Sequence, residues 1–324
     1  MISAAAIQDM NRLGNRRIPF LFVLPFDTGS EVVVPLVRAA EEGIWYNFRG
    51  AGNVSGTAVH FKDPLRFRKY PPAYTDYLKA FGIVMSGLQR GDSYLLNLTF
   101  PTPVEINRSL ADVFYTGSAP YRLLFRDEFT VFSPECFVRI LGNTISSFPM
   151  KGTIDAGIPG AAGRLISDAK EMAEHHTIVD LIRNDLSMVA SEVRVKRFRY
   201  LEEIRTHERR LLQASSEISG MLFADWPSRL GEIFAALLPA GSISGAPKAK
   251  TLEIIRKAET SDRGYYTGVC GIFDGEGLDS AVMIRFLARE GGNTVFRSGG
   301  GITINSNPES EYRELIDKVY VPIV

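Results

Sequence analysis

Short runs of hydrophobic residues, separated by turn residues, predict β-strands near the start of the chain. Residues 20–24, 31–34 and 44–48 are rich in aromatic and β-branched residues, with glycine, serine and aspartate between them. Similar runs predict further strands at 94–100, 122–125, 129–132, 137–141, 193–200, 268–273, 281–287 and 294–298. We therefore expect a protein with extensive β-sheet.

Other segments repeat their hydrophobic residues at helical spacing. Between residues 74 and 89, Tyr77, Phe81, Val84 and Leu88 are three or four positions apart. The same criterion predicts helices at 168–186, 213–222, 229–237, 247–257 and 308–319. Because helices and strands do not alternate regularly, we expect an α+β fold rather than a doubly wound α/β fold.

Composition excludes several classes of protein. The 324 residues include 37 basic and 37 acidic side chains, a balance that argues against a nucleic-acid binder. Cys136 and Cys270 form no metal-binding or disulfide pattern and are expected to be buried as small hydrophobic residues. The longest apolar run, around 20–26, is too short to cross a membrane, and we see no signal peptide. We therefore expect a cytoplasmic protein without membrane partners.

Lys151 is the first candidate for chemistry. Pro149 and Gly152 flank it, which predicts a constrained turn. A lysine buried there would have a lowered pKa and could act as a nucleophile; the alternative is an ordinary surface lysine. Glu135 has apolar neighbours that would raise its pKa and suit a general acid. The alternative is a glutamate on the rim of a pocket.

Two predicted helices carry glutamates three residues apart. Glu171 and Glu174 form one pair, and Glu311 and Glu314 the other, so each pair shares a helix face. Lys318 lies one turn beyond Glu314. A solvated face is the alternative for each pair alone, but two pairs facing one cleft could bind Mg²⁺ through carboxylate oxygens.

Two glycine-rich segments could approach a ligand closely. Residues 241–248 fail the P-loop pattern, because Pro247 replaces the second glycine and no Ser or Thr follows Lys248. The run from Gly299 through Gly301 follows a predicted strand and permits close backbone approach to a ligand, with a tight turn as the alternative.

Taken in order, these segments resemble the chorismate-utilising enzymes. That family includes anthranilate synthase component I, aminodeoxychorismate synthase component I and the isochorismate and salicylate synthases. The resemblance lies in residues 91–99, 133–135, 150–153, 174–185, 241–248, 284–285, 299–301 and 311–318. It implies large antiparallel β-sheets packed together, helices outside and a single chorismate-binding cleft. It also implies a short β-rich N-terminal segment at 1–70 and a catalytic domain at 71–324.

Within this family the residue at position 151 indicates the reaction. Aminodeoxychorismate synthases have lysine there, and anthranilate synthases have alanine. The resemblance therefore implies conversion of chorismate and ammonia to 4-amino-4-deoxychorismate, for 4-aminobenzoate and folate synthesis, with a glutaminase partner supplying ammonia. An anthranilate synthase and a non-catalytic chorismate-binding subunit remain the alternatives.

The resemblance also assigns roles to residues. Lys151 would attack chorismate, and Glu135 would protonate the leaving hydroxyl. Glu174 and Glu314 would bind Mg²⁺, with Glu171 and Glu311 as nearby or water-mediated ligands. The substrate would contact Gly152, Thr153, Ser244, Arg285, Gly299, Gly300, Gly301 and Lys318.

Three positions depart from the family pattern. Gln213 stands where the family commonly has a histidine, which in anthranilate synthases is tied to pyruvate elimination. Ile272 replaces a tyrosine of the substrate pocket, and Leu315 replaces a threonine after the metal glutamate. The first departure favours the reaction that eliminates no pyruvate.

Overall fold

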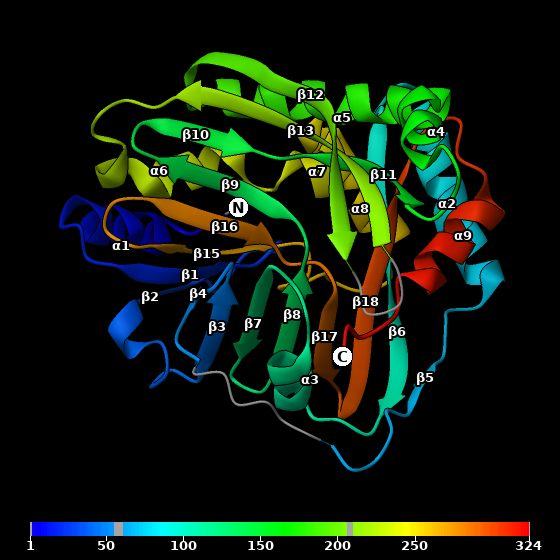
Figure 1. Ribbon diagram of the computed structural model, residues 1–324, viewed down its shortest axis with the longest axis horizontal. Helices are drawn as coiled ribbons and strands as arrows, with labels where there is room; N and C mark the ends of the chain where they lie inside the picture. The colour runs from blue at the N-terminus through cyan, green and yellow to red at the C-terminus, as the bar shows by residue number, and fades with distance from the viewer. Residues whose placement is uncertain (1, 55–60, 206–209, 324) are drawn as a thin grey trace.

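Two antiparallel β-sheets of nine strands each form the centre of the molecule. The computed structural model describes residues 2–54, 61–205 and 210–323. In Figure 1 the strands of the first sheet run across the view, and those of the second run down it. The α+β class and the large packed sheets expected from the sequence are confirmed.

The first sheet joins strands from both ends and the middle of the chain. Its order is β11-β13-β10-β9-β16-β15-β1-β2, and β12 pairs with β13. The strands are β1 (Phe20–Leu24), β2 (Val32–Pro35), β9 (Cys136–Leu141), β10 (Thr144–Ser147), β11 (Met150–Asp155), β12 (Ser191–Arg205), β13 (Arg210–Met221), β15 (Val269–Phe273) and β16 (Leu278–Val282).

The second sheet lies below the first in Figure 1. Its order is β14-β6-β18-β17-β8-β7-β3-β4, and β5 pairs with β6. The strands are β3 (Ile44–Phe48), β4 (Ala51–Gly52), β5 (Phe67–Lys69), β6 (Leu95–Ile106), β7 (Tyr121–Phe125), β8 (Phe129–Ser133), β14 (Gly245–Ala246), β17 (Phe286–Glu290) and β18 (Asn293–Ile302).

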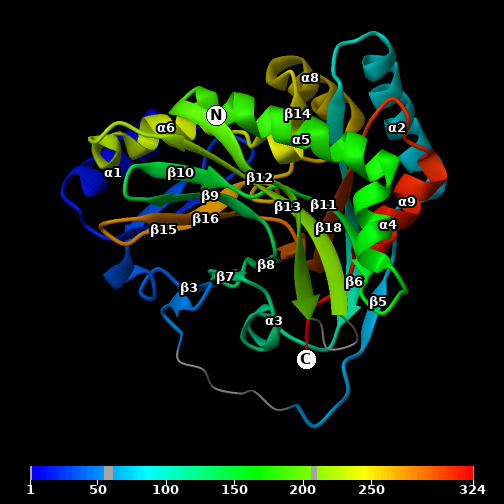
Figure 2. The same ribbon diagram turned by 45° about the horizontal axis from the view of Figure 1, so that its top comes forward.

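Helices lie outside the two sheets, as Figure 2 shows from a second direction. They are α1 (Ala4–Asn15), α2 (Tyr74–Gln89), α3 (Leu110–Thr116), α4 (Ala161–Ser167), α5 (Ala169–Ser187), α6 (Leu230–Leu237), α7 (Gly241–Ser244), α8 (Lys248–Ala258) and α9 (Pro308–Asp317). Short 3₁₀ helices occupy Leu36–Arg38 and Trp226–Arg229.

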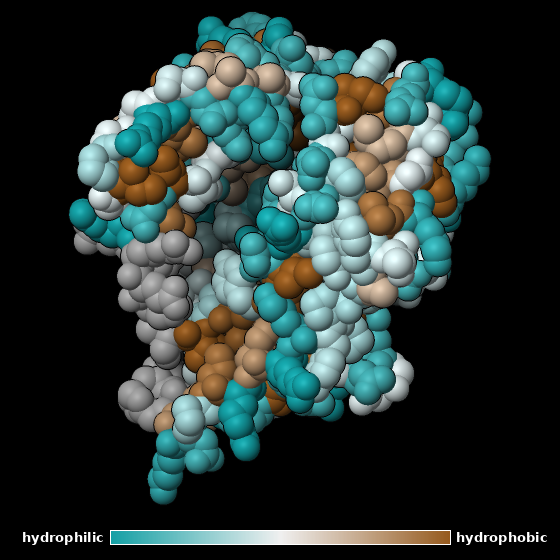
Figure 3. Space-filling view, turned by 90° about the vertical axis from the view of Figure 1, so that its right-hand side faces the viewer, coloured by the Kyte–Doolittle hydropathy of each residue, from teal (hydrophilic) through white to brown (hydrophobic). Residues whose placement is uncertain are grey.

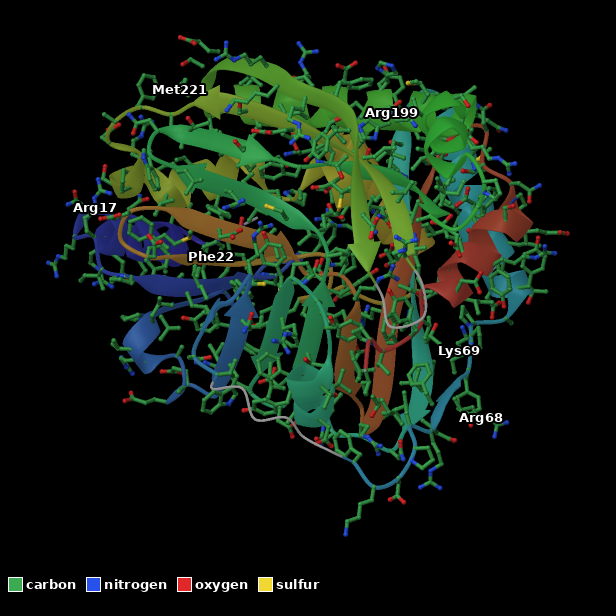
Figure 4. All side chains as sticks on the ribbon, viewed as in Figure 1. Arg17, Phe22, Arg68, Lys69, Arg199 and Met221 are labelled. Atoms are coloured by element: carbon green, nitrogen blue, oxygen red, sulfur yellow. The ribbon has the colours of Figure 1, made fainter. Side chains whose placement is uncertain are left out.

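The two faces of strand β1 pack into different parts of the hydrophobic core. Phe20 and Phe22 pack with the helices on the outer side of the first sheet, and Phe22 makes an edge-to-face contact with Phe234 of α6 (Figure 4). Leu21 and Val23 point the other way, into the core between the sheets. Both faces of the strand are therefore buried, which explains its continuous hydrophobic run.

Side-chain hydrogen bonds hold α4, α5 and α9 in place, and α5 and α9 carry the candidate metal ligands. The Asp168 side chain accepts a hydrogen bond from the Glu171 amide and caps α5, and Asn307 caps α9 in the same way. Arg199 of β12 is buried and donates to the Leu165 carbonyl of α4, while Lys69 of β5 donates to the Ile316 carbonyl of α9 (Figure 4).

Three predictions about single elements are wrong. The segment predicted as a helix at 213–222 lies in β13, a strand with neighbours on both sides. The predicted strand 281–287 is interrupted, since β16 ends at Val282 and β17 begins at Phe286. The chain before residue 20 forms α1, which the sequence interpretation missed although Ser3 caps it through the Ala6 amide.

The cysteine and membrane expectations can be compared directly with the structure. Cys136 and Cys270 are both free thiols and both buried, as expected. Among the described residues, none of the helices is long and apolar enough to cross a membrane.

A buried ion pair supports the second sheet close to its glycine-rich strand. Glu259 and Arg263 are 2.6 Å apart, with only 5% and 1% of their side chains exposed. Glu259 also accepts from the Thr99 amide, and Arg263 donates to carbonyls of Asn97 and Ile243. The pair therefore joins β6, α7 and the end of α8.

We expect Glu259→Ala to destabilise the protein by about 3–5 kcal/mol, because it leaves the Arg263 charge buried without a carboxylate to balance it. Chemical denaturation measures this change. The matched control is Glu253→Ala on α8, where the exposed pair with Lys250 predicts a loss of less than about 1 kcal/mol. Equal losses for the two variants would contradict the structural role of the buried pair.

Candidate active site

A cavity of about 270 Å³ lies where the β11 edge of the first sheet faces β6 and β18 of the second. The molecular surface is hollowed on the side seen in Figure 3. Residues predicted for the site that line this cavity are Glu135, Lys151, Gly152, Thr153, Arg285, Gly299, Gly300, Gly301, Glu314 and Lys318. The fold thus brings together segments that are far apart in the sequence.

Lys151 lies on a strand and not, as predicted, in a turn. The pairing of β11 with β13 shifts register between Met150 and Thr153, so the lysine lies in a β-bulge. Gly152 has φ of +80°, and a Cβ there would lie 2.8 Å from the Leu165 side chain. The bulge therefore requires glycine beside the lysine.

The charge state of Lys151 also differs from the prediction. Burial alone lowers the pKa of its amine, but Glu174, Glu314 and Glu171 outweigh burial and raise the pKa above its ordinary value. Its Nζ donates to Glu174 Oε2 at 3.1 Å. The raised pKa favours the ammonium form, which is not a nucleophile.

The Glu135 carboxyl has the raised pKa that its apolar neighbours predict. Burial raises the pKa of its carboxyl, and the hydrogen bond from Ser242 and the charges of Lys151 and Lys318 only partly offset this. Ser242 Oγ donates to Glu135 Oε1 at 3.0 Å. A buried carboxyl that keeps its proton at higher pH than usual is suited to general-acid catalysis.

The raised pKa of Glu135 has a consequence for stability. The folded state favours the protonated carboxyl, so its contribution is fully present below the unfolded pKa and is lost as pH rises through the folded pKa. Glu135→Gln keeps the neutral form at every pH. We therefore expect the free energy of unfolding of this variant at pH 8 to exceed that of the wild type by an amount on the order of 1 kcal/mol, with a smaller difference near pH 5. Calorimetry at both pH values checks this, and an equal difference at both would contradict it.

The four glutamates approach one another from α5 and α9. Burial and the neighbouring Glu174 raise the pKa of Glu171. Burial and the neighbouring Glu314 raise the pKa of Glu311, against the hydrogen bond from Ser306. Burial is the larger cause for both residues, and repulsion between the carboxylates adds to it.

Lysines neutralise part of this charge. Lys318 Nζ lies 2.6 Å from Glu314 Oε1 and donates to the Gly299 carbonyl. Burial raises the pKa of Glu314, but Lys318 outweighs it and the pKa is lowered. Among the described residues, no three acidic, histidine or cysteine side chains lie together in an arrangement that could hold a metal ion.

Arg285 is available for an anion. It lies between β16 and β17 with φ of +54°, and its Nη1 donates to the Lys318 carbonyl at 3.0 Å. Its buried Nε has no partner among the described residues. A guanidinium with a free donor beside a cavity can bind a carboxylate.

Some predicted contacts are not supported by the placement of the residues. Ser244 does not line the cavity, because its buried Oγ donates to the Ala240 carbonyl within α7. Ser242, two residues earlier, lines it instead, a role that the sequence interpretation missed. Three of the four predicted metal ligands, Glu171, Glu174 and Glu311, likewise lie outside the residues that line this cavity.

The three departures from the family pattern lie in different places. Gln213 lines the cavity opposite Thr153 in the strand pairing. Ile272 and Leu315 instead pack in hydrophobic clusters. Tyr266 and Asn97 also line the cavity, and the sequence interpretation assigned neither of them to the site.

Residues 53–323 match the family of chorismate binding enzymes. The chain belongs to this family. It is 52% identical over 319 residues to an uncharacterised PabA-like protein of Pasteurella multocida (strain Pm70), covering 98% of both chains. It is 33% identical over 248 residues to aminodeoxychorismate synthase component 1 of Bacillus subtilis (strain 168), covering 71% of this chain and 51% of that one.

A solved structure of a relative has the same fold. The anthranilate synthase component I of Streptococcus pneumoniae TIGR4 aligns with a TM-score of 0.65 and 27% identity, over 79% of this chain and 59% of that chain. A chorismate-converting enzyme with this α+β architecture is therefore established at the level of the family.

Proposed function

We propose that the protein is an aminodeoxychorismate synthase component I, which converts chorismate and ammonia to 4-amino-4-deoxychorismate. The observation that carries the proposal is the placement of Lys151 and Glu135 on the walls of one cavity. A lysine and a proton-bearing carboxyl are the two groups that a covalent substitution requires. The similarity to the Bacillus subtilis enzyme supports the same reaction.

The proposed substitution proceeds in two steps. Lys151 must first lose its proton, because only the free amine is a nucleophile. The amine forms a bond to C2 of chorismate while the C4–O bond breaks, and Glu135 supplies the proton with which the hydroxyl leaves as water. Ammonia then forms a bond to C4, and the C2–N bond breaks to restore the lysine amine.

Residues from the second sheet hold the substrate in this proposal. Arg285 lines the cavity and binds a carboxylate through its guanidinium, and Lys318 adds positive charge beside the Gly299 carbonyl. A Cβ at Gly299 would lie 2.7 Å from the Leu98 carbonyl, and one at Gly301 would lie 3.9 Å from Lys151 Nζ. The glycines therefore keep the space beside the nucleophile open.

The glutamates fit Mg²⁺ by the chemistry of their donors. All four offer hard carboxylate oxygens. Burial and, to a smaller extent, the neighbouring carboxylates raise the pKa of Glu171 and of Glu311, and a bound cation would offset both effects. Glu174 and Glu314 would be the ligands, with Glu171 and Glu311 nearby. Mg²⁺ bound there would neutralise the carboxylates beside Lys151 and bind a carboxylate of the substrate.

We expect Glu174→Gln to weaken Mg²⁺ binding roughly 10-fold or more, because it removes one charged ligand. Isothermal titration with Mg²⁺ measures the Kd without reference to activity. Asp180→Asn on the same helix, where the exposed aspartate pairs with Arg183, is the matched control and should leave the Kd unchanged. Equal Kd values for the wild type and Glu174→Gln would rule out this ligand.

A glutaminase that delivers ammonia, a cytoplasmic location and a place in folate synthesis complete the proposal. The second candidate is anthranilate synthase, which the similarity to the Streptococcus pneumoniae structure favours. Product analysis separates the two. We expect 4-amino-4-deoxychorismate from chorismate, ammonium and Mg²⁺, and 4-aminobenzoate once an aminodeoxychorismate lyase is added. Fluorescent anthranilate with pyruvate release and no added lyase would identify the second candidate, and binding without turnover would identify a non-catalytic subunit.

A further inference from the structure

A second, much smaller void adjoins the active-site cavity at Glu135. Its volume is about 20 Å³, and Glu135, Pro149 and Ser242 line both spaces. The two spaces therefore meet at the carboxyl that we propose as the general acid. A void of this size has room for one molecule of water or of ammonia.

The walls of the void are mostly apolar. Val138 of β9, Ile182 and Leu186 of α5, and Leu237 of α6 supply hydrophobic surface. Apart from Ser147, whose hydroxyl is bonded to the Phe137 carbonyl, and the Cys136 thiol, the polar side chains are those of Glu135, Ser242 and Asp185. A small polar molecule in this void would find its hydrogen-bond partners among these three side chains.

An ion pair holds the wall beside Glu135 in place. Asp185 Oδ1 lies 3.1 Å from Lys248 Nζ, and its Oδ2 accepts from the Gly241 amide at 3.2 Å. A Cβ at Gly241 would lie 2.6 Å from that Oδ2, so α7 approaches α5 as closely as glycine allows. Ser242, the next residue, is thereby fixed in position to donate to Glu135.

We propose that this void holds the ammonia molecule that displaces Lys151 from the substrate. The inference rests on the proposed function, because it concerns the second step of that reaction. In the first step Glu135 gives its proton to the leaving hydroxyl and becomes a carboxylate. A carboxylate at the mouth of a void the size of ammonia, fixed by Ser242, is a binding partner for an ammonium ion.

The proton balance of the second step follows. The ammonium ion gives one proton to the Glu135 carboxylate, which restores the acid and leaves ammonia with a free electron pair. That pair forms the bond to C4 while the C2–N bond breaks and its electrons return to Lys151. The product amine leaves as an ammonium group, so each turnover consumes one chorismate and one ammonium ion and releases one water.

Filling the void tests the inference. Val138→Ile and Ser147→Thr each add one carbon to its lining, and threonine keeps the hydroxyl that bonds the Phe137 carbonyl. With ammonium chloride as the nitrogen source, we expect the KM for ammonium to rise on the order of 10-fold, with the KM for chorismate unchanged. Val131→Ile adds the same carbon in a buried strand of the other sheet and should change neither constant.

Enlarging the void gives a second test with a gain of function. We expect Val138→Ala to accept methylammonium and form a product one methylene heavier by mass spectrometry, which the wild type does not form. If the filling variants do not fold, the result for Val138→Ala tests the inference on its own. An unchanged KM for ammonium in a folded filling variant, or no methylated product from Val138→Ala, would overturn the inference.

Formation of the lysine adduct shows whether a negative result counts against this inference or against the proposed function. The lysine adduct forms before ammonia is needed, so Val138→Ile and Ser147→Thr should form it at the wild-type rate. A wild type that forms neither adduct nor aminated product would contradict the proposed function itself. A wild type that forms both, with filling variants that keep their KM for ammonium, would contradict only the ammonia site.

Discussion

Lys151→Ala is expected to lower the turnover of chorismate by roughly 10³-fold or more, the scale on which the loss of a covalent nucleophile acts. The physical reason is that the lysine divides one difficult substitution into two easier ones. The measurement is the rate of 4-amino-4-deoxychorismate formation at saturating ammonium and Mg²⁺, with lyase present in excess.

The control for this variant must touch the same carboxylate without lying in the cavity. Lys170 meets that requirement, since its exposed Nζ lies 3.8 Å from Glu174 Oε1. Lys170→Ala should keep most of the activity. If Lys151→Ala and Lys170→Ala were equally active, charge near Glu174 and not a covalent role would account for the lysine.

Glu135→Gln is expected to lower turnover by about 10²–10⁴-fold, because glutamine cannot give a proton to the leaving hydroxyl. The wild type should lose activity as pH rises through the raised pKa of Glu135, since only the protonated form acts as the acid. That decline should be absent from the residual activity of the variant. Rates measured across the pH range check both statements.

The melting temperature shows whether the lower turnover of Glu135→Gln comes from the missing acid or from damage to the fold. The same substitution is expected to raise the melting temperature at pH 8, so lower activity would accompany higher stability. Glu253→Gln, on the exposed face of α8, is the control and should change neither. Wild-type turnover by the Glu135→Gln enzyme would show that the carboxyl takes no part in the mechanism.

The sequence predicted the layers of the fold better than some of its elements. Helix α2 has the predicted bounds, because its apolar residues pack on one face against β6 and α8. Strand β13 was mistaken for a helix because buried serines, including Ser215, Ser216 and Ser219, occupy positions between its neighbouring strands. Local periodicity does not show that a strand lies in the middle of a sheet.

The sequence predicted most residues of the candidate cavity and the raised pKa of Glu135, but not the raised pKa of Lys151. The segments around Lys151, Glu135 and Gly299 do line one cavity. The raised pKa of Lys151 could not be foreseen, because Glu174 reaches it only when α5 packs beside β11. Ser242 was missed for a similar reason, since only the orientation of α7 shows which serine of the segment faces Glu135.

The central claim is that Lys151 forms a covalent bond to the substrate during amination. The most direct measurement is the intact mass of the protein after incubation with chorismate and Mg²⁺ in the absence of ammonia, followed by peptide mapping. We expect an added mass of chorismate less one water, located on Lys151, absent from Lys151→Ala and discharged by ammonium. A wild type that turns over chorismate and ammonium but never carries this adduct would contradict the account.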